Sequence, residues 1–197
     1  MAGRPALTTL ALCLGTFAVQ TVGGILGIGP GAFALSLPLF HQPWTLITSV
    51  YAHGGVGHLL ANALALLVVG PLVAYVTTAA RFHTFFLATG AIAGVVQIVV
   101  AVPFGGSAVL GASGAIFALL GYLLVGNRAS ERVLARLPLG RRGRLAVFAT
   151  LAALLTAATA APGVALAAHF TGFCLGAAAG RFRMLHVRSG DERRSRH

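Results

Sequence analysis

Gly111-Ala112-Ser113-Gly114-Ala115-Ile116-Phe117 is a turn of small residues that carries one serine into the start of an apolar helix. The serine could cap that helix, because its hydroxyl can accept a hydrogen bond from a first-turn N–H that has no partner. It could also be a nucleophile, although the motif alone is weak evidence for one, since Gly111 and Gly114 allow a tight turn around Ser113 and a helix N-terminus stabilises developing negative charge. The turn alone leaves both interpretations open, so the rest of the chain has to separate them.

The composition is that of a membrane protein. The 197 residues are 57% hydrophobic and only 9% charged, with a mean hydropathy of +0.90. Several apolar runs reach about 20 residues, the length that crosses roughly 30 Å of hydrocarbon. We therefore predict an all-α polytopic membrane protein that forms a single domain over residues 1–197. Its six transmembrane helices are predicted at residues 6–28, 57–78, 82–102, 113–126, 145–161 and 163–181.

The fourth predicted helix is too short to cross the bilayer. From Ser113 to Arg128 it rises about 22 Å, which is less than the roughly 30 Å of the hydrocarbon core. Its start must then lie below the outer surface, with residues 103–110 entering as irregular backbone beside protein or a water-filled cavity. Ser113 is therefore predicted at the floor of a wet cavity that opens to the outside. The proline-rich connection 29–56 is predicted to lie in the membrane interface.

Every basic side chain is an arginine, and all of them fall on one side of the six-helix arrangement. The positive-inside rule then places both termini in the cytoplasm, with residues 182–197 as a basic cytoplasmic tail. Contact with anionic lipids of the bilayer explains this charge better than nucleic-acid binding does. We therefore expect a multi-pass protein of the cell membrane with no nucleic-acid partner. The arginines are Arg4, Arg81, Arg128, Arg132, Arg136, Arg141, Arg142, Arg144, Arg181, Arg183, Arg188, Arg193, Arg194 and Arg196.

A histidine in the last predicted helix lies at the depth of the serine. His169 is twelve residues before Arg181, which places it about 18 Å from the cytoplasmic end. A histidine in a membrane could be a packing residue or a base, and its equal depth with Ser113 favours a base. Small residues continue along its face of the helix and along one face of the fourth helix, so close packing would bring the two polar residues together. These small residues are Gly172, Gly176 and Gly180, and Gly114, Ala118 and Gly121.

Two further polar residues share one face near the start of the second helix. His58 and Asn62 are spaced i,i+4, so their side chains project together. They could donate hydrogen bonds to an anionic tetrahedral intermediate together with the Ser113 backbone N–H, or they could form a polar clamp between helices. They are too few for a metal site, and we predict neither a metal nor a cofactor. Nearby His53 could be an ordinary loop histidine.

The carboxylates are predicted to be out of reach of Ser113 and His169. Glu131, Asp191 and Glu192 are the only carboxylate side chains, and all three lie on the predicted cytoplasmic side. Serine catalysis would therefore have to use a Ser–His dyad. The chain also has no His-Glu-x-x-His pattern for a metalloprotease and no pair of membrane aspartates for an aspartyl protease.

In their order, helix assignment and depth, these residues resemble the rhomboid intramembrane serine proteases. The resemblance implies a rhomboid-like six-helix bundle in which Ser113 is the nucleophile and His169 the general base and acid. It further implies that His58, Asn62 and the Ser113 N–H stabilise the oxyanion. The features that carry it are the Trp44-bearing first loop, His58-x-x-x-Asn62, Gly111-x-Ser113-Gly114, and His169-x-x-Gly172 followed by Gly176.

Two positions depart from the family pattern. Thr45 follows Trp44 where the family often has arginine, and Phe117, which could still pack against the His169 ring, stands where the family often has tyrosine. The resemblance implies an endopeptidase that cleaves transmembrane segments of other membrane proteins near their outer end. The alternatives are a non-proteolytic rhomboid-like scaffold that binds transmembrane helices and, less favoured, a small-solute transporter.

Overall fold

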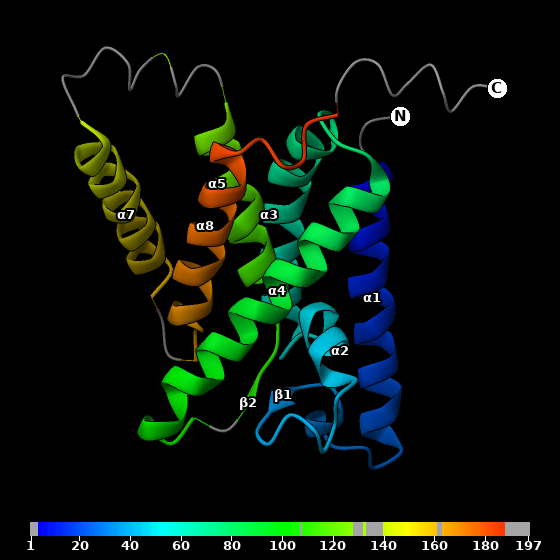
Figure 1. The fold of residues 1–197 in the computed structure, drawn as a ribbon. Coiled ribbons are helices and arrows are strands. Elements are labelled where there is room, and N and C mark those ends of the chain that lie inside the picture. Colours follow the sequence, from blue (N-terminus) through cyan, green and yellow to red (C-terminus); the bar gives the residue numbers. More distant parts are fainter. Residues whose placement is uncertain (1–3, 107, 128–131, 133–139, 161–162, 188–197) are drawn as a thin grey trace.

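A computed structural model describes residues 4–106, 108–127, 132, 140–160 and 163–187 of the chain. These residues contain seven α-helices, one more than the predicted six, and one two-stranded sheet (Figure 1). The additional helix is short and lies in the first connection, where the sequence predicts none; it is α2 (Thr45–Tyr51). The other helices occupy the predicted ranges and are α1 (Arg4–Ile25), α3 (Val56–Ala74), α4 (Ala79–Ala101), α5 (Ser113–Gly126), α7 (Arg141–Ala158) and α8 (Leu166–Arg181).

The ends of these helices differ from the predicted ones by up to four residues, for local reasons. Helix α1 ends at Ile25 because Gly27 takes up a φ of +85°, and the N–H of Ile28 returns to the carbonyl oxygen of Gly23 at 2.8 Å. Helix α4 begins earlier than predicted because the Thr78 hydroxyl caps its first turn. Boundaries of this kind depend on single turn residues, which hydropathy does not register.

Three of the described helices are long and apolar enough to cross a membrane, judged by length and composition. They are α1, α3 and the helical stretch Ala79–Phe104 that contains α4. Helix α5 is a shorter apolar helix of 14 residues, which corresponds to about 21 Å. Helices α7 and α8 remain predicted spans, so the number of transmembrane crossings stays a prediction.

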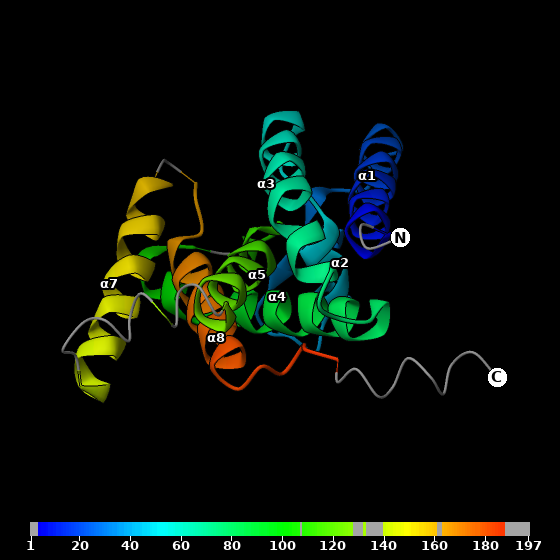
Figure 2. The same cartoon turned by 90° about the horizontal axis from the view of Figure 1, so that it is seen from above.

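Helix α5 lies in the middle of the bundle, where it contacts α3, α4 and α8 (Figures 1 and 2). Helix α1 packs against α3, and α7 lies at the edge of the bundle, where it packs against α8. The start of α1 and the end of α8 lie at the same end of the bundle (Figure 1). Whether that end faces the cytoplasm stays a prediction.

The segment before α5 is more regular than the sequence predicts. After α4 the chain forms a 3₁₀ turn, Val102–Phe104, and then strand β2 (Ala108–Val109). This strand pairs antiparallel with β1 (Leu35–Ser36) of the first connection. The pairing satisfies backbone polar groups that irregular backbone would leave without partners. It also joins the first connection to the turn that carries the serine.

The residues that follow α8 fold back onto the bundle. Leu185 is only 4% exposed, and the backbone N–H of Val187 donates to the carbonyl oxygen of Val76 at 3.1 Å. Residues 182–187 of the predicted tail are therefore part of the packed structure. The remainder of that tail, several of the arginines, and the carboxylates lie outside the described residues; the carboxylates are Glu131, Asp191 and Glu192.

Candidate active site

Ser113 is the first residue of α5, and the residue at the N-cap position is Ala112. No side chain caps the helix, and among the described residues the Ser113 hydroxyl has no hydrogen-bond partner, so the capping interpretation of this serine is wrong. Gly111 takes up a φ of +130°, which glycine adopts readily. Its N–H donates to the carbonyl oxygen of Ser49 in α2 at 2.8 Å. The turn is thus tied to α2 while the hydroxyl remains free.

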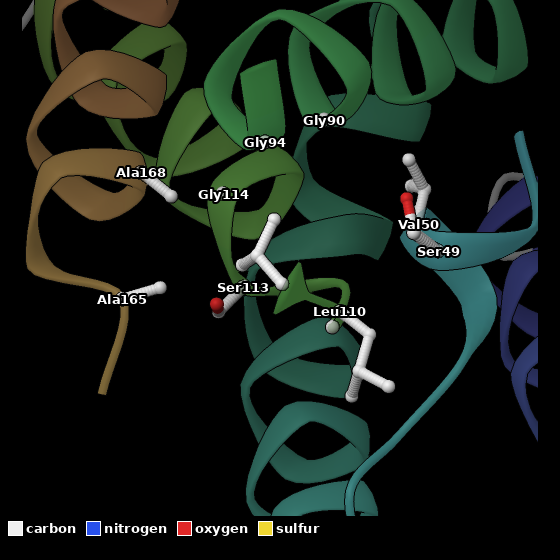
Figure 3. Close-up of a pocket in the computed structure, with 11 residues that line it drawn as sticks. Ser49, Val50, Gly90, Gly94, Leu110, Ser113, Gly114, Ala165 and Ala168 are labelled. Atoms are coloured by element: carbon white, nitrogen blue, oxygen red, sulfur yellow. The ribbon is translucent and has the colours of Figure 1, made fainter. Parts of the chain in front are cut away.

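A cavity of about 20 Å³ lies beside Ser113. Leu110 and Gly111 line it from the turn, and Ala165 and Ala168 line it from the start of α8. The side chains of Ser113 and Ala165 point toward each other across this space (Figure 3). A cavity of this size has room for about one water molecule.

Small residues hold α8 directly against α5. A side chain added at Gly172 would overlap the carbonyl oxygen of Gly114, and one added at Gly114 would lie 2.9 Å from the Ala93 Cβ of α4. The small faces therefore meet backbone to backbone, as close helix packing in membranes requires. This contact places the first turn of α8, which carries His169, beside the first turn of α5.

His169 is 6% exposed and lies in the first turn of α8. Its imidazole stacks on the ring of Phe117, with the ring centres 4.4 Å apart and the planes inclined by 12°. Phe117 follows Ser113 by about one helical turn, so the imidazole packs on the face of α5 that carries the serine. Among the described residues no hydrogen bond joins His169 to Ser113, and such bonds are often longer before substrate binds.

His169 has a polar partner at the end of α7. Thr159 is the C-cap residue of α7, and its Oγ1 lies 2.9 Å from Nδ1 of His169. The same oxygen donates to the carbonyl oxygen of Thr156 at 2.8 Å. The sequence carries no signal for this contact, because a threonine at the end of an alanine-rich helix has no spacing that relates it to a histidine on the next helix.

The structure brings His58 to the serine turn. A side chain at Gly111 would come within 2.7 Å of Cε1 of His58, so the imidazole packs against that turn. Asn62 is 7% exposed, and its Nδ2 donates to the carbonyl oxygen of His58, one turn earlier, at 2.9 Å. That bond lies within α3 and does not form a clamp between helices. Among the described contacts, Asn62 makes none with Ser113 or His169.

His53 lies in the loop between α2 and α3, as predicted, and it is buried against His58. It is 2% exposed, and its ring centre lies 5.2 Å from that of His58. Its backbone N–H donates to Oε1 of Gln20 at 2.9 Å, and its Nδ1 lies 3.0 Å from the carbonyl oxygen of Tyr51. Burial, together with repulsion from His58, lowers the pKa of His53 to about 4. In the described part of the chain no three His, Cys, Asp or Glu side chains gather as a metal site would need.

A glutamine of α4 holds the start of α8. Oε1 of Gln97 accepts a hydrogen bond from the backbone N–H of Ala168 at 3.1 Å. First-turn N–H groups have no partner within their own helix, so this side chain acts as a cap supplied by another helix. It fixes the backbone immediately before His169, and hydropathy patterns do not reveal it.

The comparison with protein families decides the assignment. The model of the Rhomboid domain matches residues 41–185, about three quarters of the chain. The chain belongs to the rhomboid family. This rhomboid is 36% identical over 129 residues to the rhomboid protease GluP of Bacillus subtilis (strain 168), an alignment that covers 62% of this chain and 25% of that protein. It is 31% identical over 134 residues to RHOMBOID-like protein 1 of Arabidopsis thaliana, an alignment that covers 58% of this chain and 31% of that protein.

This rhomboid therefore spans less than a third of the length of either relative. Family membership and the three long apolar helices show an integral membrane protein. The matched residues include the serine turn, the start of α3 and all of α8, so the site described above lies inside the family domain.

Proposed function

We propose that this rhomboid is a serine endopeptidase that cleaves transmembrane segments of other membrane proteins near their outer end. Ser113 is the nucleophile and His169 the general base and acid. Two observations carry the proposal: the hydroxyl of Ser113 is free at the start of α5, and the His169 imidazole is stacked on Phe117, about one turn later in the same helix. A free hydroxyl and a fixed base at the start of two adjacent helices are the parts that acyl transfer needs.

In the proposed reaction His169 takes the proton of Ser113 as its oxygen attacks the scissile carbonyl carbon. The imidazolium then protonates the leaving amine, and a water molecule hydrolyses the acyl-enzyme. The cavity beside the serine has room for about one water, which matches that last step. Proton transfer is contained within the Ser–His dyad.

The oxyanion is proposed to be held by Ser113 N–H, His58 and Asn62. The first helical hydrogen bond of α5 runs from the N–H of Ile116 to Ala112, so the Ser113 N–H has no helical partner. His58 packs against the adjacent turn. Donors at such positions are worth several kcal/mol where charge develops, on the order of 3 kcal/mol for one donor.

The remaining expectations about topology belong to the same proposal. Six spans, both termini in the cytoplasm and a cavity open to the outside would let a substrate helix present its outer end to Ser113. The arginines would face anionic lipids. Substrates are expected to be transmembrane proteins, and the relative named as a rhomboid protease supports this at the level of the family.

The competing function is a non-proteolytic scaffold that binds transmembrane helices on the same bundle. One observation favours it: no hydrogen bond joins Ser113 to His169 in the described residues. The two functions differ in whether Ser113 is chemically activated. A serine-directed fluorophosphonate would label an activated Ser113 and would leave a scaffold unlabelled.

The test is cleavage of a transmembrane reporter in liposomes by wild type, Ser113→Ala and His169→Ala, with fluorophosphonate labelling of the same samples. Ser36→Ala, a serine in β1, is the matched control. We expect cleavage and labelling by wild type and Ser36→Ala and neither by the two site variants. A folded wild type that is neither labelled nor active would establish the scaffold, and site variants that cut as well as wild type would refute the dyad.

A further inference from the structure

Oγ1 of Thr159 is in contact with two atoms at once. It lies 2.9 Å from Nδ1 of His169 and 2.8 Å from the carbonyl oxygen of Thr156. Both distances are those of hydrogen bonds, so each contact needs a hydrogen atom between its two heavy atoms. Where those two hydrogens come from decides the protonation pattern of the imidazole.

The source of the hydrogens follows from the chemistry of the three groups. The carbonyl oxygen of Thr156 has no hydrogen to give, so the single hydroxyl hydrogen of Thr159 must point to it. If that hydrogen pointed to His169 instead, two oxygens would face each other at 2.8 Å with nothing between them. The hydrogen between Thr159 and His169 therefore comes from Nδ1 of His169.

We propose that Thr159 is a positioning residue that holds His169 in the neutral tautomer with the proton on Nδ1. Neutral imidazole carries one proton, so Nε2 then has a free lone pair. This inference rests on the proposed function, because only a general base needs that lone pair. Thr159 thereby supplies the acceptor that a carboxylate supplies in many serine hydrolases.

The proton balance of the first step follows directly. The hydrogen of Ser113 Oγ moves to Nε2 of His169 as the new bond from Oγ to the carbonyl carbon forms. Nδ1 keeps its own proton, and its bond to Thr159 becomes charge-assisted in the imidazolium, which strengthens it as charge develops. The proton on Nε2 later passes to the leaving amine, which restores the starting tautomer.

Residues from two separate helices thus hold the face and the Nδ1 edge of the imidazole. Phe117 of α5 holds the face of the ring, with the planes inclined by 12°, and Thr159 at the end of α7 holds the Nδ1 edge. Stacking alone would still allow the ring to flip by 180° about χ2, which keeps the ring plane but exchanges Nδ1 with Cδ2 and Nε2 with Cε1. The hydrogen bond removes that freedom.

Kinetics of Thr159→Val and Thr159→Ser test the role. Valine keeps the shape and removes the acceptor, whereas serine restores the hydroxyl. We expect Thr159→Val to lower kcat about tenfold, the effect of one lost hydrogen bond, with little change in KM, and Thr159→Ser to recover most of it. Thr8→Val is the matched control, because the Thr8 hydroxyl donates to the Arg4 carbonyl oxygen on the exposed face of α1.

The tautomer itself is read from ¹⁵N spectra of histidine-labelled protein, with His169→Asn to assign the signals. We expect wild-type His169 to show a protonated Nδ1 and an unprotonated Nε2, and Thr159→Val to lose this preference. A proton on Nε2 in wild type, or a Thr159→Ser variant as slow as Thr159→Val, overturns the proposal. If the tautomer is as expected but folded wild type neither cleaves the reporter nor is labelled, the hydrogen bond stands and the proposed protease function fails.

Discussion

Gly176 of α8 lies against the carbonyl oxygen of Ala118 in α5, with no space for a side chain between them. The same arrangement occurs one turn earlier, between Gly172 and the carbonyl oxygen of Gly114. Backbone faces backbone at both positions, so neither partner can move aside by changing a rotamer. The distance between the two helices that carry the site is therefore set by glycines.

Gly176→Ala should push α8 away from α5. We expect a loss of about 1–3 kcal/mol of unfolding free energy, the usual size of overpacking, together with loss of cleavage because His169 moves with α8. Thermal unfolding can be followed through the thiol of Cys13, which is 3% exposed, after Cys174 is replaced by serine. Gly15→Ala is the control, since no atom lies within 4 Å of its new Cβ. An equal loss of unfolding free energy in Gly176→Ala and Gly15→Ala would contradict the packing argument.

Phe117→Leu should lower kcat about tenfold while the protein stays folded. An aromatic stack of this geometry contributes about 0.5–1.5 kcal/mol beyond its buried area, and leucine keeps the apolar volume without the ring. Phe117→Tyr keeps the ring and should retain activity close to that of wild type. The measurement is initial rates on the reporter in liposomes. A leucine variant as fast as wild type would show that the ring face does not hold the His169 imidazole.

Gly111→Ala should impair the turn for two reasons that can be separated. The backbone φ of +130° disfavours a side chain, and the new Cβ would lie 2.7 Å from Cε1 of His58. We expect a loss of roughly 1–3 kcal/mol from backbone strain alone. In a His58→Ala background the steric part disappears, so Gly111→Ala should cost less there. Gly27→Ala, at a φ of +85° with nothing within 4 Å, measures strain without a clash.

If the effects of Gly111→Ala and His58→Ala on the unfolding free energy simply add, His58 does not contact the turn. The readout is a double-mutant cycle on thermal unfolding, with the coupling taken from wild type, the two single variants and the double variant. Neighbours in contact give coupling of about 0.5–3 kcal/mol. Stability is the safer readout here, because His58→Ala is expected to reduce activity by itself.

Gln97→Met should loosen the first turn of α8. Methionine has a similar length but cannot accept the hydrogen bond from Ala168 N–H, so we expect that amide to exchange its hydrogen about fivefold faster, which corresponds to about 1 kcal/mol. Cleavage should slow as well, because His169 is the next residue. Val99→Met, on the exposed face of the same helix, is the control. Unchanged exchange at Ala168 would show that Gln97 is not its cap.

Stability should fall as the pH drops from about 6.5 toward about 4, and His53 should account for part of that fall. Its pKa is lowered from 6.5 to about 4 by burial and by repulsion from His58, so between these values the unfolded chain binds a proton that the folded chain does not. The fall in unfolding free energy that His53 causes begins near pH 6.5 and ends near pH 4. Unfolding temperatures across this range should show a shallower slope for His53→Asn, and an identical slope would refute the assignment.

The helices were predictable because apolar runs report burial in lipid or protein directly. The range of α5 agrees at both ends, since Ser113 follows a turn and Asn127 ends the apolar run. Helix α2 was missed because its residues Thr45–Tyr51 follow a stretch broken by prolines and are too few to form a clear apolar run. The β1–β2 pair was missed for a related reason, since two residues per strand leave no alternation to detect.

The candidate site was predictable only where depth and spacing carry information. Ser113, His169 and the glycine faces follow from counting residues along helices. The contacts of Thr159, Gln97 and Gln20 do not, because each joins residues of different elements through one hydrogen bond. Such partners depend on rotations of whole helices, which a single sequence does not encode in any local pattern.

The fold-back after α8 has a practical consequence for handling the protein. Arg81 donates to the carbonyl oxygen of His186 at 3.2 Å, the Tyr122 hydroxyl lies 2.6 Å from Nδ1 of His186, and Val187 is bonded to the turn before α4. A purification handle or a truncation placed beyond Val187 leaves these bonds intact. One placed at the end of α8 would remove the bonds to α4, to α5 and to the turn between α3 and α4, so an inactive preparation of that kind would say nothing about Ser113.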